Sequence, residues 1–220
     1  MNYRIFVLLI FVLSFVIGCW EDDVVTPTDN DSETVTICNQ VWMTKNLDVD
    51  RYRNGDIIPQ VNDSSVWNHL TTGAWCYYKN DSARGKISGK LYNWYAVIDP
   101  RGLAPIGWHI PSEDEWIELQ DCLGYDNAGG KMKVQSTKYW GPPNTGATNS
   151  SGFSAIPGGQ AFEYDEEWDA IYCLGFWWSS SESRYNKRWA SHTSIFNNTK
   201  LLDIFGMPKE SGLSVRCIKD

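Results

Sequence analysis

The feature that most limits the fold of this chain is the even spread of turn signals through residues 35–220. Pairs such as Asn54-Gly55 and Gly158-Gly159 separate apolar stretches that are only a few residues long. Asn-Gly is a strong hairpin signal, and short apolar stretches between such turns are typical of strands. The chain also has 12 Trp and 11 Tyr, enough for a large aromatic core with some rings left on the surface. We therefore expect short strands and long ordered loops, and not a helical bundle.

Residues 112–124 carry the clearest helix signal. Ser112 is suited to cap the N-terminus of a helix, and the Glu115 carboxylate can accept a hydrogen bond from the Ser112 backbone N–H. The apolar residues that follow share one helix face: Trp116, Leu119 and Leu123. Gly124 then supplies a stop signal. The pattern predicts a helix between Ser112 and Gly124.

Other elements are marked by shorter patterns. Residues 35–47 are rich in β-forming side chains and predict an N-terminal strand that leads into a loop. Residues 74–78 predict a short buried strand, and residues 212–218 the last strand. Residues 91–98 place large apolar side chains at spacings of three and four, which predicts a helix. Trp177 and Trp178 are expected in the core.

The first residues have the layout of an export signal. Arg4 precedes an apolar run over residues 5–17, which is too short for a good membrane span because a span needs about 20 residues. The run ends in Gly18-Cys19, which resembles the lipobox of bacterial lipoproteins, although Val16 stands where Leu is usual. This resemblance implies that residues 1–18 are removed and Cys19 is lipidated. An ordinary cleaved signal followed by a chance Cys is the alternative.

Residues 19–34 lack periodic apolar positions and are expected to be a flexible acidic tether. The acids that follow Cys19 resemble a surface-export signal, and we expect an outer-membrane or cell-surface location. Removing residues 1–18 takes away Arg4 and no acid, so 19 basic residues become 18 against 27 acidic ones, a charge of −9. Binding to nucleic acid or anionic headgroups through bulk charge is therefore excluded, and membrane contact is expected through the lipid alone.

Five cysteines remain once Cys19 is lipidated: Cys38, Cys76, Cys122, Cys173 and Cys217. An exported protein can form disulfides, so we expect one or two bridges and at least one free thiol. No two of these cysteines form a C-x-x-C motif, which argues against structural zinc and thioredoxin-like redox chemistry.

The chain resembles the Fibrobacter succinogenes major paralogous domain family over most of its length. The matching segments, in the order of the family, are 40–59, 89–119, 144–159, 176–182 and 212–220. That family is similar in turn to the C-type-lectin-like fold of formylglycine-generating enzymes. The resemblance implies an α+β domain over residues 35–220 with two short helices, short antiparallel strands and long ordered loops. It also implies that the first and last strands lie side by side.

The resemblance has consequences for the cysteines. Cys76 and Cys217 stand where the family commonly has Cys, which implies a bridge with Cα atoms roughly 4.4–6.8 Å apart. Cys38 replaces a usual Gly, while Cys122 and Cys173 look like additions, and their pairing stays open. The copper and oxygen chemistry of the related enzymes is not expected, because Cys173 and Cys217 do not form the required motif.

Known catalytic patterns are missing from the sequence. The three His are far apart without metal-ligand spacing, and His109, just before a helix cap, is expected to be a packed structural residue. An acidic segment could bind Ca²⁺, but a solvated loop is the better interpretation. Its acids are Glu163, Asp165, Glu166, Glu167 and Asp169. We expect no enzyme activity, cofactor or metal.

The candidate ligand-binding residues lie within residues 184–198, where aromatic, Arg and Asn side chains alternate. They are Arg184, Tyr185, Arg188, Trp189, Asn197 and Asn198. Aromatic faces with polar groups at their edges are typical of sites for sugars or protein partners. The sequence thus favours a lipid-anchored surface protein that binds or adheres to a glycan or a protein. The alternatives are an enzyme acting on an extracellular polymer, and a structural envelope or fimbrial subunit.

Overall fold

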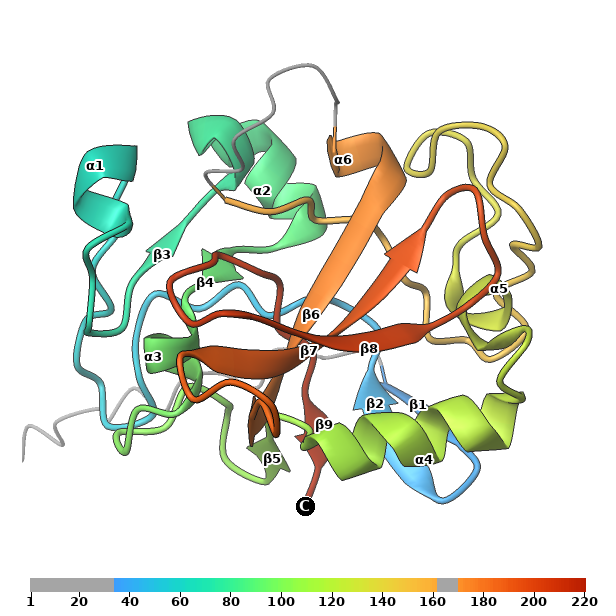
Figure 1. The fold of residues 1–220 in the computed structure, drawn as a ribbon, viewed down its shortest axis with the longest axis horizontal. Helices are drawn as coiled ribbons and strands as arrows, with labels where there is room; N and C mark the ends of the chain where they lie inside the picture. Colours follow the sequence, from blue (N-terminus) through green and yellow to red (C-terminus); the bar gives the residue numbers. More distant parts are fainter. Residues whose placement is uncertain (1–33, 162–169) are drawn as a thin grey trace, which may run out of the picture. The chain divides into compact units, whose positions relative to one another are not determined.

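A three-stranded antiparallel sheet of order β6-β7-β8 lies at the centre of the computed structural model, which describes residues 34–161 and 170–220 (Figure 1). Its strands are β6 (Leu174–Glu182), β7 (Trp189–Phe196) and β8 (Asp203–Pro208). Trp177 and Trp178 of β6 are fully buried, which confirms their predicted place in the core. The middle strand β7 is also buried from Ala190 to Ile195.

A second sheet has the order β1-β2-β9-β5. It contains β1 (Thr34–Ile37), β2 (Gln40–Met43), β5 (Trp108–His109) and β9 (Ile218–Lys219). Trp42 pairs with Ile218, so the expected adjacency of the first and last strands is confirmed. The single strand expected over 35–47 is instead a hairpin, and the strand expected over 212–218 is regular only at its end. Three of the residues before it make isolated bridges, Gly212 to Ala161, Leu213 to Tyr92 and Ser214 to Trp177.

The hairpin turn between β1 and β2 carries the disulfide described in this structure. Cys38 has φ +54°, a left-handed conformation that favours glycine. Cys38 is bonded to Cys122 in the last turn of α4, with the two Cα atoms 6.7 Å apart.

The predicted bridge between Cys76 and Cys217 is wrong, because both thiols are free and buried. Cys76 belongs to the small sheet of β3 (Trp75–Cys76) and β4 (Leu91–Tyr92), whereas Cys217 directly precedes β9 in the other sheet. The two side chains pack in separate hydrophobic clusters. Burial raises the pKa of each thiol to about 12, so neither is a reactive thiolate at neutral pH.

The helix predicted over 91–98 is shorter than expected. Leu91 and Tyr92 pair with β3, and Asn93 then caps α3 (Trp94–Val97) by accepting from the Ala96 backbone N–H. Sheet pairing therefore outweighs the helical spacing in the first two residues of the segment, and Ile98 is left 46% exposed.

The helix predicted between Ser112 and Gly124 is confirmed as α4 (Glu113–Leu123), with the capping box formed by Ser112 and Glu115. The other helices, beyond the two that were expected, are α1 (Ser64–Trp67), η1 (Tyr78–Asn80), α2 (Ser82–Ser88), α5 (Ala128–Met132) and α6 (Ala170–Cys173). With its helices and antiparallel sheets, the domain is of the α+β class.

The two faces of the central sheet pack against different hydrophobic clusters. Trp178 and Ala190 belong to one cluster, and Trp177 and Ile195 belong to the other together with Trp116 of α4. This follows from the alternation of side chains along each strand. Helix α4 therefore covers one face of the sheet, and the candidate site lies between α4 and that face.

Candidate ligand groove

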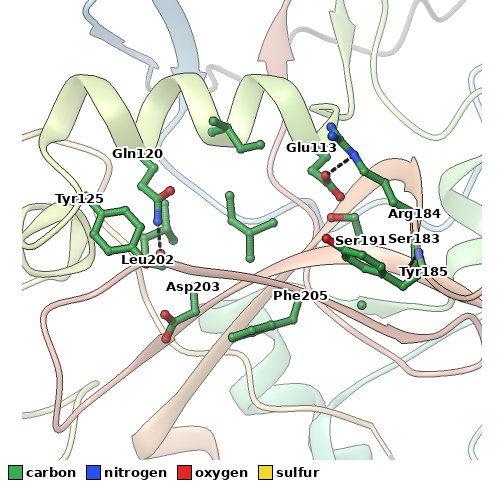
Figure 2. Close-up of a pocket in the computed structure, with 13 residues that line it drawn as sticks. Glu113, Gln120, Tyr125, Ser183, Arg184, Tyr185, Ser191, Leu202, Asp203 and Phe205 are labelled. Carbon is green, nitrogen blue, oxygen red and sulfur yellow. Dashed lines mark hydrogen bonds and ion pairs between the residues drawn. The ribbon is translucent and has the colours of Figure 1, made fainter.

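A groove of about 450 Å³ lies between α4 and β8, with the β6–β7 turn at one end (Figure 2). Its lining residues come from three segments that are far apart in the sequence. They are Glu113, Ile117, Gln120, Tyr125, Ser183, Arg184, Tyr185, Ser191, Leu202, Asp203, Ile204, Phe205 and Gly206.

The middle of the groove is apolar, and one end is aromatic. Ile117 of α4 and Ile204 of β8 are both among its lining residues. The Gln120 side-chain amide donates to the Leu202 carbonyl oxygen and ties the helix to the segment before β8. Tyr125 lies at this end with 61% of its surface exposed, so a ligand can reach its ring.

The opposite end is formed by an ion-pair cluster. Arg184 Nε is 2.8 Å from Glu113 Oε1, and Arg184 Nη2 is 2.8 Å from Asp114 Oδ1. The Glu113 backbone N–H also donates to Ser181 Oγ at 3.0 Å. These contacts join the β6–β7 turn to the first turn of α4 and leave Tyr185, which is 98% exposed, beside them.

Two hydroxyl groups lie under this cluster. Ser183 Oγ accepts from the Tyr185 backbone N–H at 3.3 Å. Ser191, on β7, is 1% exposed, and its Oγ has no hydrogen-bond partner among the described residues. Gly206 pairs with Ser191 across the strands, and a Cβ on Gly206 would lie 2.9 Å from Ser183 Oγ. A side chain at position 206 would therefore press against Ser183 and against the Trp189 ring, 3.2 Å away.

Two lining residues point the other way. The side chains of Asp203 and Phe205 lie on the side of β8 that faces away from α4 (Figure 2). This matches the strand register, because Asp203 and Phe205 pair with Ser194 and His192 on the face that α4 does not cover. Burial raises the pKa of Asp203, whose carboxylate does not face the groove.

The predicted ligand-binding residues are split by the structure. Arg184 and Tyr185 line the groove, and the exposed Arg188 and the partly exposed Trp189 follow directly. Trp189 and Phe196 bound β7, an eight-residue strand that spans roughly 27 Å at about 3.4 Å per residue. Residues 184–198 are therefore not one surface loop, because their middle is buried strand.

The last two predicted residues lie at the far end of β7. The side-chain amide of Asn197 donates to the carbonyl oxygens of Gly141 at 3.2 Å and Pro142 at 2.9 Å. Asn198 follows it and is exposed. Placing Asn197 and Asn198 in one site with Arg184 was wrong, since the amide of Asn197 holds two loops together instead.

The α4 side of the groove was missed by sequence reasoning. Glu113, Gln120 and Tyr125 were not among the predicted ligand-binding residues. The contact between Glu113 and Arg184 joins residues 71 positions apart, and no local pattern reports such a pairing. The visible signal was the excess of acids in the first turn of α4, beyond the one that the capping box needs.

Several other expectations concern residues elsewhere. Cys19, the signal segment and the acids at 163–169 lie outside the described residues. His109, expected to be packed, is 40% exposed in its side chain and lies between Glu115 and Asp220, each 2.8 Å away. In residues 34–161 and 170–220, no group of three or more His, Cys, Asp or Glu is placed to hold a metal ion. No helix in this part of the chain has the length and apolarity to cross a bilayer.

A known protein family matches the sequence of this domain. Neither the curated proteins nor the solved structures include a match to this chain. The description Fibrobacter succinogenes major domain matches residues 35–219, which is nearly all of the described structure. The chain belongs to the Fibrobacter succinogenes major domain family.

Proposed function

We propose that this protein is a non-catalytic binding or adhesion domain that holds an extracellular glycan in the groove between α4 and β8. The observation that carries the proposal is the pair of exposed rings, Tyr125 and Tyr185, at the two ends of one groove (Figure 2). Exposed aromatic rings have a hydration cost that ligand stacking removes. Polar groups between the rings would fix the orientation of the sugars.

The proposal includes an anchor and a fold type. The lipobox-like end at Gly18-Cys19 supports a lipid anchor on Cys19 and an outer-membrane or cell-surface location. The pairing of β2 with β9 supports a C-type-lectin-like arrangement, because such a fold brings its first and last strands together. A glycan of the surrounding medium or of a neighbouring cell is then within reach of the groove.

The carboxylates support binding without turnover. Hydrolysis of a glycosidic bond needs two carboxyl groups that flank the bond. Glu113 is neutralised by Arg184, and Asp203 points to the other side of β8. The two acids that line the groove therefore do not face each other across it.

A glycan array tests the proposal with the domain labelled and washed at physiological salt. We expect capture of at least one oligosaccharide without product release, and Tyr125→Ala and Tyr185→Ala should each weaken binding about 10-fold, as for a moderate hot spot. Ile106→Ala is the matched control, because Ile106 is 83% exposed but lies outside the groove. Product release would favour the polymer-acting enzyme, and self-assembly at micromolar concentration would favour the structural subunit. Capture that survives both Tyr substitutions would exclude this groove.

A further inference from the structure

The polar end of the groove contains a buried hydroxyl that the fold itself does not use. Ser191 Oγ is buried, lines the groove and has no partner within the described part of the chain. A buried polar atom without a partner costs about 1–3 kcal/mol, so such atoms commonly have a ligand or other role. Gly206 and Ser183 border the same position, because Gly206 pairs with Ser191 across the strands and Ser183 Oγ lies 2.9 Å from the place of a Cβ on Gly206.

The charges at this end oppose an anionic ligand. Arg184 is already paired through Nε with Glu113 and through Nη2 with Asp114, so two carboxylates balance its positive charge. The first turn of α4 holds three acids, Glu113, Asp114 and Glu115. An incoming anion would meet these carboxylates there, although helix N-termini usually attract anions.

The backbone donors of that helix end are also in use. The Glu113 backbone N–H donates to Ser181 Oγ at 3.0 Å, and the Glu115 backbone N–H donates to Ser112 Oγ at 3.2 Å. These contacts leave the hydroxyls of Ser183 and Ser191 as the groups suited to a ligand. A hydroxyl both donates and accepts, so a sugar hydroxyl is a complementary partner for either.

Resting on the function proposed above, we propose that the groove is specific for uncharged sugars and that Ser191 is a specificity-determining residue. One hydroxyl group of the sugar forms a hydrogen bond with Ser191 Oγ at the innermost point of the groove, beside Ser183 and Gly206. The ring of the sugar stacks on Tyr185. The acids around Arg184 exclude the corresponding uronic acid, in which a carboxylate replaces the hydroxymethyl group.

The test uses matched oligosaccharides that end in glucose or glucuronate, and in galactose or galacturonate, with affinities measured by calorimetry. We expect at least one neutral probe to bind 10-fold or more tightly than its acidic partner. Asp114→Asn should reduce the ratio of neutral-probe affinity to acidic-probe affinity, because it removes one repelling charge. The Asp114 side chain is 82% exposed, so the substitution does not disturb the core. If the wild-type protein binds neutral and acidic probes equally, or prefers the acidic ones, the proposal is overturned.

Two substitutions on the same strand test the role of Ser191 itself. Ser191→Ala should weaken binding of the neutral probe about 5-fold, the effect of one lost hydrogen bond, while the melting temperature stays constant or rises. Thr193→Val is the matched control, since Thr193 Oγ1 is also buried and unpartnered among the described residues but does not line the groove. Unchanged affinity in Ser191→Ala overturns the role of Ser191. Failure of every probe, neutral and acidic, would instead refute the proposed function.

Discussion

Arg216 and Arg184 are the same residue type in opposite surroundings. Arg216 is 1% exposed, and it donates to the carbonyl oxygens of Met43 at 3.1 Å and Phe153 at 2.7 Å, and to Asn46 Oδ1 at 2.7 Å. These acceptors are all neutral. Arg184 is 62% exposed in its side chain and contacts two carboxylates. The buried arginine joins three chain segments into a frame, whereas the exposed one lines the groove between α4 and β8.

Lys133 repeats the arrangement of Arg216. Its Nζ donates to the carbonyl oxygens of Phe196 at 3.0 Å and Thr199 at 2.7 Å, and it lies 5.5 Å from the centre of the Trp140 ring. Burial lowers the pKa of this amine to about 8. A chain with many long loops can thus fix them by inserting cations among backbone carbonyls, because each cation offers several donors at once.

The largest expected effect comes from Arg216→Ala. The substitution leaves the buried carbonyl oxygens of Met43 and Phe153 without this donor and opens a cavity beside the Phe153 ring, so the free energy of unfolding should fall by about 4 kcal/mol or more. Arg184→Ala should cost less than about 1 kcal/mol, because exposed ion pairs are weak. Urea denaturation measures both. A similar fall in the free energy of unfolding for the two variants would contradict the view that Arg216 holds the fold together and Arg184 does not.

A smaller effect is expected from Cys122→Ser. The Cys38–Cys122 bridge links residues 84 positions apart, and its loss should lower the free energy of unfolding by about 3 kcal/mol, mainly by freeing the unfolded chain. A reducing agent should destabilise the wild type to the same extent and leave the variant unchanged. If the reducing agent had equal effects on both proteins, the bridge would not be the cause.

The smallest effect is a pH dependence from His109. Burial by itself lowers the pKa of His109, but the hydrogen bonds and charges of Glu115 and Asp220 outweigh it, so the pKa is raised. The added stability is therefore complete below the unfolded pKa, about 6.5, and is lost as the pH rises through the folded value. It should stay under about 1 kcal/mol, because the ring is partly exposed and solvent screens the pairs.

The measurement compares wild type with His109→Gln between about pH 5.5 and 8. The comparison with the variant is needed because a second histidine also titrates. Burial lowers the pKa of His192 to about 4, so His192 destabilises the fold as the pH falls below the pKa that it has in the unfolded chain. The stability of wild type relative to the variant should decrease with rising pH. A constant difference would show that His109 is not charged in the folded protein.

Local signals in the sequence predicted local structure well. The capping box of Ser112 and Glu115 is a contact between near neighbours, and α4 has the predicted ends. Residues 91–98 misled because the same apolar spacing suits a helix and a buried strand, and the partner that decides, Trp75, lies elsewhere in the chain. The Cys pairing failed for a similar reason, since only the fold shows that the β1–β2 turn meets the end of α4.

The candidate site shows the same difference between local sequence patterns and contacts that only the fold creates. Arg184 and Tyr185 were found because exposed aromatic and charged residues cluster in that part of the sequence. Ser191 was not found, since a serine within a buried strand gives no signal until its missing partner is seen in three dimensions.

The bridge between the β1–β2 turn and α4 also determines how a pulling force travels through the domain. Thr34 begins β1, Cys38 follows four residues later, and Cys122 lies in the last turn of the helix that lines the groove. A tensile load applied at Thr34 therefore reaches that helix along a covalent path. A ligand held against α4 and an anchor on the N-terminal side would then be linked through one sulfur–sulfur bond.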